Sequence, residues 1–312
     1  MIAAFITDVG ALESCHPLTC SRPLAACPVA NRPLLEQQEA VLRAAGCERL
    51  SVAPSAKGQS FLCLAGNAWV TPEDLARLIA ANAPAVLHDS TGIPLAWLTD
   101  GTATTPPAAA PLLTAVKPAL AIRFAWDLLR VNELLVGALS ENCIQGTVSD
   151  RVEIDGHLVL GAGSRILPGV YIEGNVIIGE NCKIGPNCYI RGNTAIGDKC
   201  HVGQAVEIKN CILMNNVSIG HLSYVGDSIF GAHSNLGAGT ITANLRHDGR
   251  SHSSLVAGKL VDTGRRKLGI IIGDGVHTGI HTSLYPGRKL WPGTSTLPGS
   301  VVRKDVTEAV SE

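Results

Sequence analysis

An aliphatic side chain recurs at every sixth position through the middle of the chain. The run consists of Val148, Ile154, Leu160, Ile166, Ile172, Ile178, Ile184, Ile190, Ile196, Val202, Ile208 and Met214. The following position is often glycine, and the fourth position after each aliphatic residue is small or apolar. This period is typical of a parallel β-helix, in which three hexapeptide faces form a coil of about 18 residues around inward-pointing side chains. The pattern predicts an all-β domain over residues 146–312.

The repeat is interrupted once. Its register slips after Met214, to Ile219, Val225, Phe230 and Leu236, and returns at Ile272, Thr278, Leu284, Leu290 and Thr296. Residues 245–268 follow no such period, so we expect a loop extruded from the coil. Extruded loops often carry function, although a surface insertion without a function would have the same pattern.

The first 105 residues alternate strand and helix patterns instead. The expected elements are strands at Ile2–Thr7 and Arg49–Pro54 and helices at Pro33–Ala45 and after Thr71. Thr71 is a good N-cap residue, Pro72 suits the first helical position, and Asp74 lies three residues after the cap. These patterns predict an α/β, Rossmann-like domain.

A segment rich in Pro, Ala and Thr begins at Asp100, and a long apolar stretch from Ala119 to Leu139 predicts a helix. We therefore expect three parts: an α/β domain over residues 1–105, a linker and connecting helix over 106–145, and the β-helix over 146–312.

Composition narrows the function classes. The 25 basic and 26 acidic side chains nearly balance, which gives no electrostatic footprint for nucleic acid or an anionic membrane. No apolar run approaches the length of about 18 residues that spans a bilayer. The start reads as a strand rather than a secretory signal, so we expect a cytoplasmic protein with reduced thiols. None of the ten cysteines forms a C-x-x-C pair, and we expect no metal site; Cys182, Cys188 and Cys200 fall at small inward positions of the repeat.

Two cations interrupt the polar positions of the repeat. Arg191 and Lys209 are 18 residues apart, which predicts that they stack on adjacent coils about 4.8 Å apart. Two such cations repel unless an anion lies between them, so the pair suggests a phosphate site. The alternative is that both side chains project into water and stay apart.

Residues with proton-transfer and hydrogen-bonding chemistry follow this pair. His221 and Tyr224 fall on the next coil, so we expect both close to the cationic edge. Asn235 lies in the glycine-rich NLGAGT, and Asn244 precedes the extruded loop. A histidine beside an anion site suits a general base acting on a phosphorylated substrate, whereas a lone histidine in a β-protein is more often structural.

These residues carry a resemblance to a known family. The segments IKN, HLSYVGDSIFG, NLGAGTITANL and IIGDGV resemble the acetyltransferase domain of the bifunctional N-acetylglucosamine-1-phosphate uridyltransferase and glucosamine-1-phosphate N-acetyltransferase family. The resemblance covers about residues 148–303 and implies a left-handed β-helix, a homotrimer and active sites assembled from neighbouring chains.

The resemblance also implies residue roles. His221 would be the catalytic base, Arg191, Lys209 and Tyr224 would hold the sugar phosphate, and Asn235 and Asn244 would position the amino sugar. Acetyl-CoA would contact Ala238, Gly239, Gly279 and Ile280, and backbone amides near Gly237 would stabilise the oxyanion. The chain departs from the family at Leu245, Gly269 and Ile280; Gly269 replaces a substrate lysine, for which Lys267, Arg266 or Arg265 could substitute.

The first domain resembles the nucleotidyltransferase partner of that family in a shortened form. The resemblance lies in the segment HPLTCSRPLAACPVANRPLLEQQEAVLRAAG, which begins at His16. Leu12, Glu13 and Ser14 replace the phosphate-loop Gly, Thr and Arg, Leu24 replaces a lysine, and Asn67 replaces an aspartate that binds metal in the family. A carboxylate without these cations is unsuited to a triphosphate, so the resemblance implies a degenerate domain.

Three functions remain open from the sequence. The first is a CoA-dependent N-acetyltransferase acting on an amino-sugar phosphate similar to glucosamine-1-phosphate, in the UDP-N-acetylglucosamine pathway, with acetyl-CoA as co-substrate. The second is a sugar-1-phosphate nucleotidyltransferase (a UDP-N-acetylglucosamine diphosphorylase), which alone would require Mg²⁺ and would release pyrophosphate. The third is a non-catalytic trimer that binds sugar nucleotides. Binding of CoA would distinguish an acetyltransferase from such a trimer.

Overall fold

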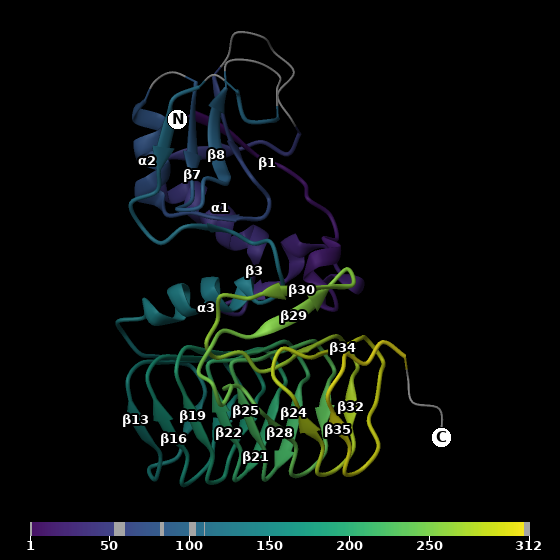
Figure 1. The fold of residues 1–312 in the computed structure, drawn as a ribbon. Helices are drawn as coiled ribbons and strands as arrows, with labels where there is room; N and C mark the ends of the chain where they lie inside the picture. The colour runs from purple at the N-terminus through teal and green to yellow at the C-terminus, as the bar shows by residue number, and fades with distance from the viewer. Residues whose placement is uncertain (1, 53–59, 82–83, 100–103, 109, 309–312) are drawn as a thin grey trace. The chain divides into compact units, whose positions relative to one another are not determined.

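The computed structural model describes residues 2–52, 60–81, 84–99, 104–108 and 110–308 (Figure 1). The chain divides into two compact units. The first consists of residues 1–12, 23–27 and 32–123, and the second of residues 13–22, 28–31 and 124–312. Short N-terminal segments therefore belong to the C-terminal unit, which sequence patterns do not indicate.

The first unit is built on a mixed sheet of six strands in the order β4-β1-β5-β8-β7-β9. Their bounds are β1 Ile2–Ile6, β4 Cys47–Arg49, β5 Phe61–Leu64, β7 Ala85–His88, β8 Pro94–Thr99 and β9 Leu112–Thr114. The α-helices are α1 Leu34–Ala44 and α2 Pro72–Ala80, and the short elements are β3 Arg32–Pro33, β6 Ala68–Trp69, β10 Leu120–Ala121 and the 3₁₀ helix Leu24–Ala26. The α/β class is confirmed.

Helix α2 begins as predicted, because the Thr71 hydroxyl accepts a hydrogen bond from the Asp74 amide at 3.3 Å. The strand predicted at Arg49–Pro54 is wrong, since β4 ends at Arg49 and pairs with β1 over Cys47–Arg49. Residues 53 and 54 lie outside the described part of the chain.

The segment between the domains contains more structure than its composition predicts. Strand β9 pairs with β7, and β10 pairs antiparallel with β6, so both belong to the first unit. Residues 100–103 and 109 of the segment rich in Pro, Ala and Thr lie outside the described residues. The helix predicted from Ala119 is wrong in its first half: α3 spans Asp127–Gly137. Asp127 accepts a hydrogen bond from the Phe124 amide at 3.0 Å, which helps fix this later start.

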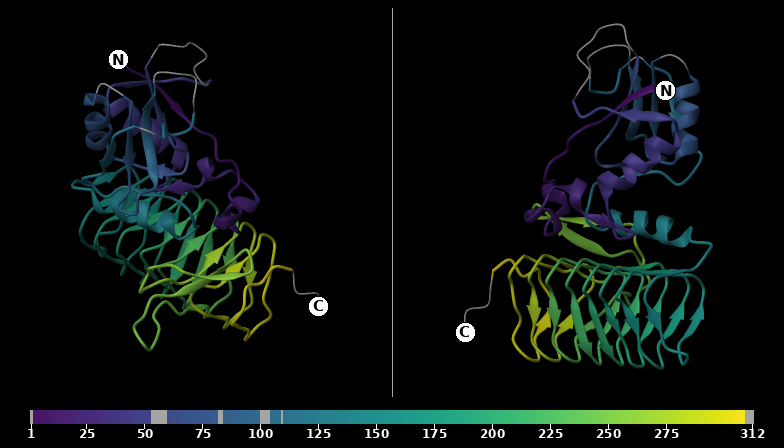
Figure 2. Two further views of the ribbon diagram at one scale, coloured as in Figure 1. Left: turned by 45° about the horizontal axis from the view of Figure 1, so that its top comes forward. Right: turned by 180° about the vertical axis from the view of Figure 1, so that it is seen from behind.

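The second unit is a parallel β-solenoid with three sheets, as the six-residue period predicts (Figures 1 and 2). The first sheet contains β11 Cys143–Ile144, β14 Leu158–Leu160, β17 Val176–Ile178, β20 Thr194–Ile196, β23 Ile212–Leu213, β26 Ile229–Phe230, β31 Ile271–Ile272 and β34 Lys289–Leu290. The second contains β12 Thr147–Val148, β15 Arg165–Ile166, β18 Lys183–Ile184, β21 His201–Gln204, β24 Ser218–His221, β27 Asn235–Leu236 and β32 His277–Thr278. The third contains β13 Glu153–Asp155, β16 Tyr171–Glu173, β19 Tyr189–Arg191, β22 Glu207–Lys209, β25 Tyr224–Gly226, β28 Ile241–Thr242, β33 Ser283–Leu284 and β35 Val301–Val302.

The solenoid core is formed by the aliphatic repeat, whose members from Leu160 to Ile208 are buried. Met214 does not continue the repeat, because Leu213 pairs with Ile196 and occupies the next core position. The corner between the third and first sheets loses one residue here, and Asn210 turns it in a left-handed conformation at φ 53°. The register slip therefore begins before Met214, not after it.

The buried cysteines fit this core as predicted. Cys182, Cys188 and Cys200 are each about 2% exposed, and the Cys182 thiol donates to the Gly197 carbonyl oxygen at 3.0 Å. Burial raises the pKa of Cys188 to about 11, so its thiol is protonated at neutral pH. These side chains fill the interior.

The extruded segment folds as a β-hairpin rather than an irregular loop. Strands β29 Ser253–Val256 and β30 Lys259–Asp262 pair antiparallel, and an isolated bridge between Leu245 and Lys267 closes the base. The buried His252 contacts the Asn244 carbonyl oxygen through Nε2 at 2.9 Å, which ties the hairpin to the last residue of the coil before it.

The N-terminal segments of the second unit pack on the solenoid. They contain two 3₁₀ helices, Glu13–Cys15 and Leu18–Cys20, and strand β2 Pro28–Val29. Ser21 donates to Asp274 at 2.6 Å, and Arg22 forms an ion pair with the same carboxylate.

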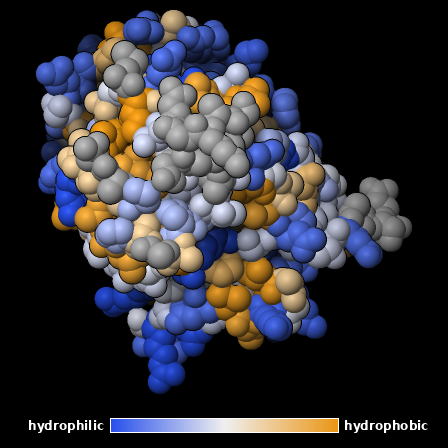
Figure 3. Space-filling view, turned by 90° about the horizontal axis from the view of Figure 1, so that it is seen from above, coloured by the Kyte–Doolittle hydropathy of each residue, from blue (hydrophilic) through white to orange (hydrophobic). Residues whose placement is uncertain are grey.

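Among the described residues, no helix is long and apolar enough to cross a bilayer. The face shown in Figure 3 intersperses hydrophilic and apolar residues.

Candidate functional site

The outer surface of the third sheet carries two columns of polar side chains. Arg191 pairs with Lys209, and Lys209 pairs with Gly226, at the ends of their strands. At the strand starts, Tyr189 pairs with Glu207 and Glu207 pairs with Tyr224. The 18-residue spacing therefore places the two cations on adjacent coils, as predicted.

Each cation of this column has a carboxylate partner within the chain. Arg191 Nη2 lies 2.7 Å from Glu207 Oε1, and Lys209 Nζ lies 3.0 Å from Asp227 Oδ2. Burial disfavours the charged guanidinium of Arg191, but the Glu207 carboxylate outweighs it and the pKa of Arg191 is raised. Stacking of the two cations thus does not require a bound anion, contrary to the expectation from spacing alone.

Asp227 joins the site residues and was missed by the sequence analysis. Its side chain is 3% exposed, and its backbone turns the equivalent corner on the next coil, after Gly226, in a left-handed conformation at φ 51°. It accepts hydrogen bonds from Lys209, from Asn210 Nδ2 at 3.0 Å and from Asn244 Nδ2 at 2.6 Å. A buried carboxylate that accepts from this many donors fixes the positions of three side chains.

Asn244 also contacts Tyr224, and this contact passes above Gly226. The Asn244 amide donates to the Tyr224 hydroxyl oxygen at 3.0 Å. A Cβ at Gly226 would lie 2.5 Å from that oxygen and 2.7 Å from Asn244 Nδ2, so only glycine allows this crossing. Burial, with Asp227 and Glu207 nearby, raises the pKa of Tyr224, which keeps the phenol protonated and able to donate to a ligand.

His221, which the sequence predicts close to the edge that carries the cations, lies on a different sheet. It ends β24 on the second sheet, opposite Gln204, whereas Tyr224 begins β25 on the third sheet. The strand Tyr224–Gly226 separates the two edges by about 7 Å at about 3.3 Å per residue. His221 is exposed, and its carbonyl oxygen accepts from Ser223 Oγ at 2.8 Å.

A ladder of backbone hydrogen bonds continues from His221 along this corner. The Gly239 amide donates to the His221 carbonyl oxygen at 3.1 Å, and the His281 amide donates to that of Ala238 at 2.8 Å. The ladder continues where Gly299 donates to Ile280, whose side chain is 50% exposed. His221 is thus followed on successive coils by the residues predicted to contact acetyl-CoA.

The glycines of this corner are required by close packing between coils. A Cβ at Gly239 would lie 2.6 Å from His281 Nδ1, and one at Gly279 would lie 2.5 Å from the Leu297 carbonyl carbon. Asn235 is exposed on the second sheet, where it begins β27 and pairs with Ser218 and His277, so it lies on a different sheet from the strand that Asn244 follows.

Gly269 has no room for the lysine that the family pattern leads one to expect. A Cβ there would lie 2.1 Å from the Gly226 carbonyl oxygen and 2.1 Å from Ser228 Oγ. Lys267, in contrast, is exposed at the base of the hairpin.

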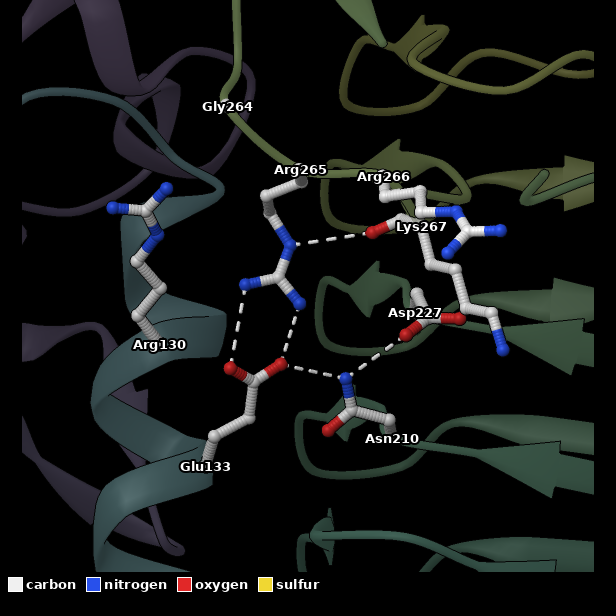
Figure 4. Close-up of a pocket in the computed structure, with 8 residues that line it drawn as sticks. All are labelled: Arg130, Glu133, Asn210, Asp227, Gly264, Arg265, Arg266 and Lys267. Atoms are coloured by element: carbon white, nitrogen blue, oxygen red, sulfur yellow. Dashed lines mark hydrogen bonds and ion pairs between the residues drawn. The ribbon is translucent and has the colours of Figure 1, made fainter. Parts of the chain in front are cut away.

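A pocket of about 530 Å³ lies beside the shortened corner (Figure 4). Its lining comes from α3, the corner and the end of the inserted segment, and consists of Arg130, Glu133, Asn210, Asp227, Gly264, Arg265, Arg266 and Lys267. Glu133 accepts from Asn210 Nδ2 at 2.7 Å and pairs with Arg265. Asp227 therefore belongs both to this pocket and to the site on the third sheet.

The described residues do not fit a magnesium site in the first unit. Asn67, which replaces the metal-binding aspartate of the resemblance, donates its side-chain amide to the Ile122 carbonyl oxygen at 3.1 Å. Leu24, at the position of the expected lysine, is fully buried. Over the described part of the chain, no group of three His, Cys, Asp or Glu side chains could hold a metal ion.

The missed residues differ in how visible they are in the sequence. Asp227 follows Lys209 by 18 residues, the spacing that identified the cation pair, so it could have been found. Glu207 could also have been found, because it lies two residues before Lys209 on the same strand and therefore faces outward like Lys209. Glu133 and Arg130 of α3 could not have been found from the repeat, because Glu133 lies 77 residues before its hydrogen-bonding partner Asn210.

Comparison with known proteins adds relatives of the solenoid. A family model described as the GMPPB C-terminal domain matches residues 172–284. The chain is 41% identical over 181 residues to a bifunctional sugar-1-phosphate nucleotidylyltransferase/acetyltransferase of Sulfurisphaera tokodaii, covering 58% of this chain and 45% of the relative. It is 51% identical over 175 residues to the bifunctional protein GlmU of Methanococcus maripaludis strain C7, covering 56% of this chain and 42% of the relative.

A third relative is the bifunctional protein GlmU of Methanocaldococcus jannaschii, 40% identical over 176 residues that cover 55% of this chain and 43% of the relative. The resemblance predicted from the motifs is confirmed by these names. The chain spans about half the length of the curated relatives that it matches.

Proposed function

We propose that the C-terminal unit transfers an acetyl group from acetyl-CoA to the amine of an amino-sugar phosphate similar to glucosamine-1-phosphate. One observation carries the proposal. His221 is the last residue of β24 on the second sheet, at the corner where the backbone ladder through Ala238 and Ile280 borders the polar face of the third sheet. A donor along the ladder and an acceptor across the face would meet at His221.

The acceptor lies across the outer surface of the third sheet in this proposal. Tyr224 and Asn244 hydrogen-bond the sugar, and its phosphate end points toward the edge of the sheet that carries Arg191 and Lys209. The separation of about 7 Å between the two edges is comparable with the length of a hexose phosphate. The amine then reaches the corner that carries His221.

His221 removes a proton from the amine as it attacks the thioester carbonyl carbon. Its exposed imidazole has access to the substrate, and histidine is the side chain most often used for proton transfer of this kind. The thioester carbonyl becomes an oxyanion, which a backbone amide near Gly237–Gly239 stabilises. Collapse of this intermediate releases the CoA thiolate, which takes up a proton, and leaves an N-acetyl amide.

Acetyl-CoA lies along the corner in contact with Ala238, Gly239, Gly279 and Ile280. Exposed apolar side chains of the same unit, Leu222, Ile241 and Ile280, suit contact with a second copy of the chain. A homotrimer in which a neighbouring chain covers the donor, and to which it contributes Asn235, completes the proposal. We do not extend the proposal to nucleotidyl transfer, because Leu24 and Asn67 replace the lysine and the metal-binding aspartate of the family that the first domain resembles.

The test is transfer from acetyl-CoA to glucosamine-1-phosphate, followed by release of the CoA thiol. The variant His221→Ala should lose at least about 100-fold in kcat, the usual contribution of a general base. His247→Ala is the matched control, since His247 is an exposed histidine of the inserted segment. Unchanged turnover in His221→Ala would refute the assignment. A wild-type protein that binds a sugar nucleotide but does not bind CoA would favour the non-catalytic trimer.

A further inference from the structure

Three cations of the pocket in Figure 4 differ from the rest. Within the described residues, Arg130, Arg266 and Lys267 form no ion pair with a carboxylate. All three are exposed, and all three line the same pocket. Their charges are therefore available to a ligand.

The carboxylates of the pocket are already engaged. Glu133 pairs with Arg265 and accepts from Asn210. Asp227 pairs with Lys209 and accepts from two side-chain amides. The four cationic and two anionic lining residues thus leave an excess of positive charge on Arg130, Arg266 and Lys267.

The column on the third sheet is less suited to bind an anion tightly. Arg191 and Lys209 would have to share their charges between a phosphate and the carboxylates of Glu207 and Asp227. An unpaired guanidinium gains more from a phosphate, which it can bind through two parallel N–H···O bonds.

We propose that the phosphate of the acceptor is bound in this pocket by Arg130, Arg266 and Lys267. The inference rests on the proposed function for the identity of the ligand, and it adds α3, through Arg130, to the substrate site. Asp227 links the two regions, because it contacts Asn244 on the sugar side and lines the pocket on the other. The sugar then lies at Tyr224 and Asn244 with its phosphate past the corner.

The experiment measures binding and turnover separately in the full-length chain. Binding of inorganic phosphate and of glucosamine-1-phosphate is followed by calorimetry for the wild type, Arg130→Gln and Lys267→Gln. Each variant should weaken both ligands about tenfold, the effect of losing one charge-assisted hydrogen bond. The KM for glucosamine-1-phosphate should rise by the same factor, while the KM for acetyl-CoA is unchanged.

Arg165→Gln is the matched control, because Arg165 is an exposed arginine of the solenoid outside the pocket. It should leave every value unchanged. Wild-type affinity should also fall as salt is added, since the site is open to solvent.

The outcomes separate the two proposals. Acetyl transfer with unaltered phosphate affinity and KM in both variants overturns this inference and leaves the proposed function standing. Loss of phosphate binding in both variants, in a protein that transfers no acetyl group, supports the anion site and overturns the proposed function. An equal loss in Arg165→Gln overturns the pocket as the binding place. Weaker binding of inorganic phosphate alone would also overturn the inference, since the acceptor would then use other cations.

Discussion

Replacing Asp227 with Asn tests whether this buried carboxylate organises the candidate site. The substitution keeps the size of the side chain and removes its charge. Asp227 Oδ2 accepts from Lys209 at 3.0 Å and from Asn244 at 2.6 Å, and Oδ1 accepts from Asn210 at 3.0 Å. An asparagine retains one acceptor and presents an NH₂ group to donors in place of the other.

The expected loss of stability follows from these contacts. A hydrogen bond to a charged group contributes about 1.5–3 kcal/mol, and at least one is lost while a donor faces a donor. Lys209 also loses its partner, but its side chain is 16% exposed and part of its charge can reach water. We therefore expect Asp227→Asn to lower the free energy of unfolding of the C-terminal unit by about 3 kcal/mol, near the lower end for breaking a buried pair.

A double-mutant cycle with Lys209→Gln isolates the ion pair. The free energies of unfolding come from urea titrations of the full chain followed by circular dichroism and fitted with two transitions, because the chain forms two units. The coupling energy should be about 1–2 kcal/mol, because the pair is only partly exposed. The reasoning is wrong if the cycle is additive within about 0.5 kcal/mol or if Asp227→Asn is as stable as the wild type.

Two further predictions concern neighbours of this carboxylate. Gly226→Ala places a methyl group 2.5 Å from the Tyr224 hydroxyl, so the KM for the acceptor should rise about tenfold and the free energy of unfolding should fall by about 1–3 kcal/mol. Gly220→Ala is the control, because a Cβ at Gly220 has no neighbour within 4 Å, and this variant should be as stable as the wild type in the same titration. Burial lowers the pKa of His252 below its ordinary 6.5, so the unfolded chain binds this proton more readily than the folded chain. The stability of the C-terminal unit should therefore fall as the pH drops below about 6.5. His252→Gln should make that fall shallower between about pH 7 and 5, and a pH profile identical to that of the wild type would contradict the assignment.

The periodic parts of the structure were predictable because one rule governs many residues. A six-residue period fixes which side chains face inward, and three periods bring Arg191 beside Lys209. The hairpin could also have been recognised, because Ala257 and Gly258 turn it with φ values of 45° and 77°, and a glycine between two aliphatic runs is the usual signal for such a turn.

Departures from the period were harder to locate. The corner at Asn210 is one residue shorter than the corner before it, and nothing in the aliphatic pattern distinguishes a slip there from one after Met214. This shift of one residue places Gly226 beside Lys209 and leaves Asp227 at the corner, where it faces the pocket. His221 was misplaced for a related reason: spacing along the chain gives its coil but not which sheet edge it occupies.

The N-terminal segments explain how α3 comes to line the pocket. Asn132 of α3 accepts a hydrogen bond from the Ala30 amide at 2.9 Å and donates to the Asn193 carbonyl oxygen at 2.8 Å. It thereby joins the segment 28–31 to the solenoid corner between β19 and β20, while Arg22 holds the segment 13–22 on Asp274. Because Arg130 lies two residues before Asn132 in the same helix, the segments that resemble a nucleotidyltransferase opening now help position a cation of the proposed acetyltransferase site.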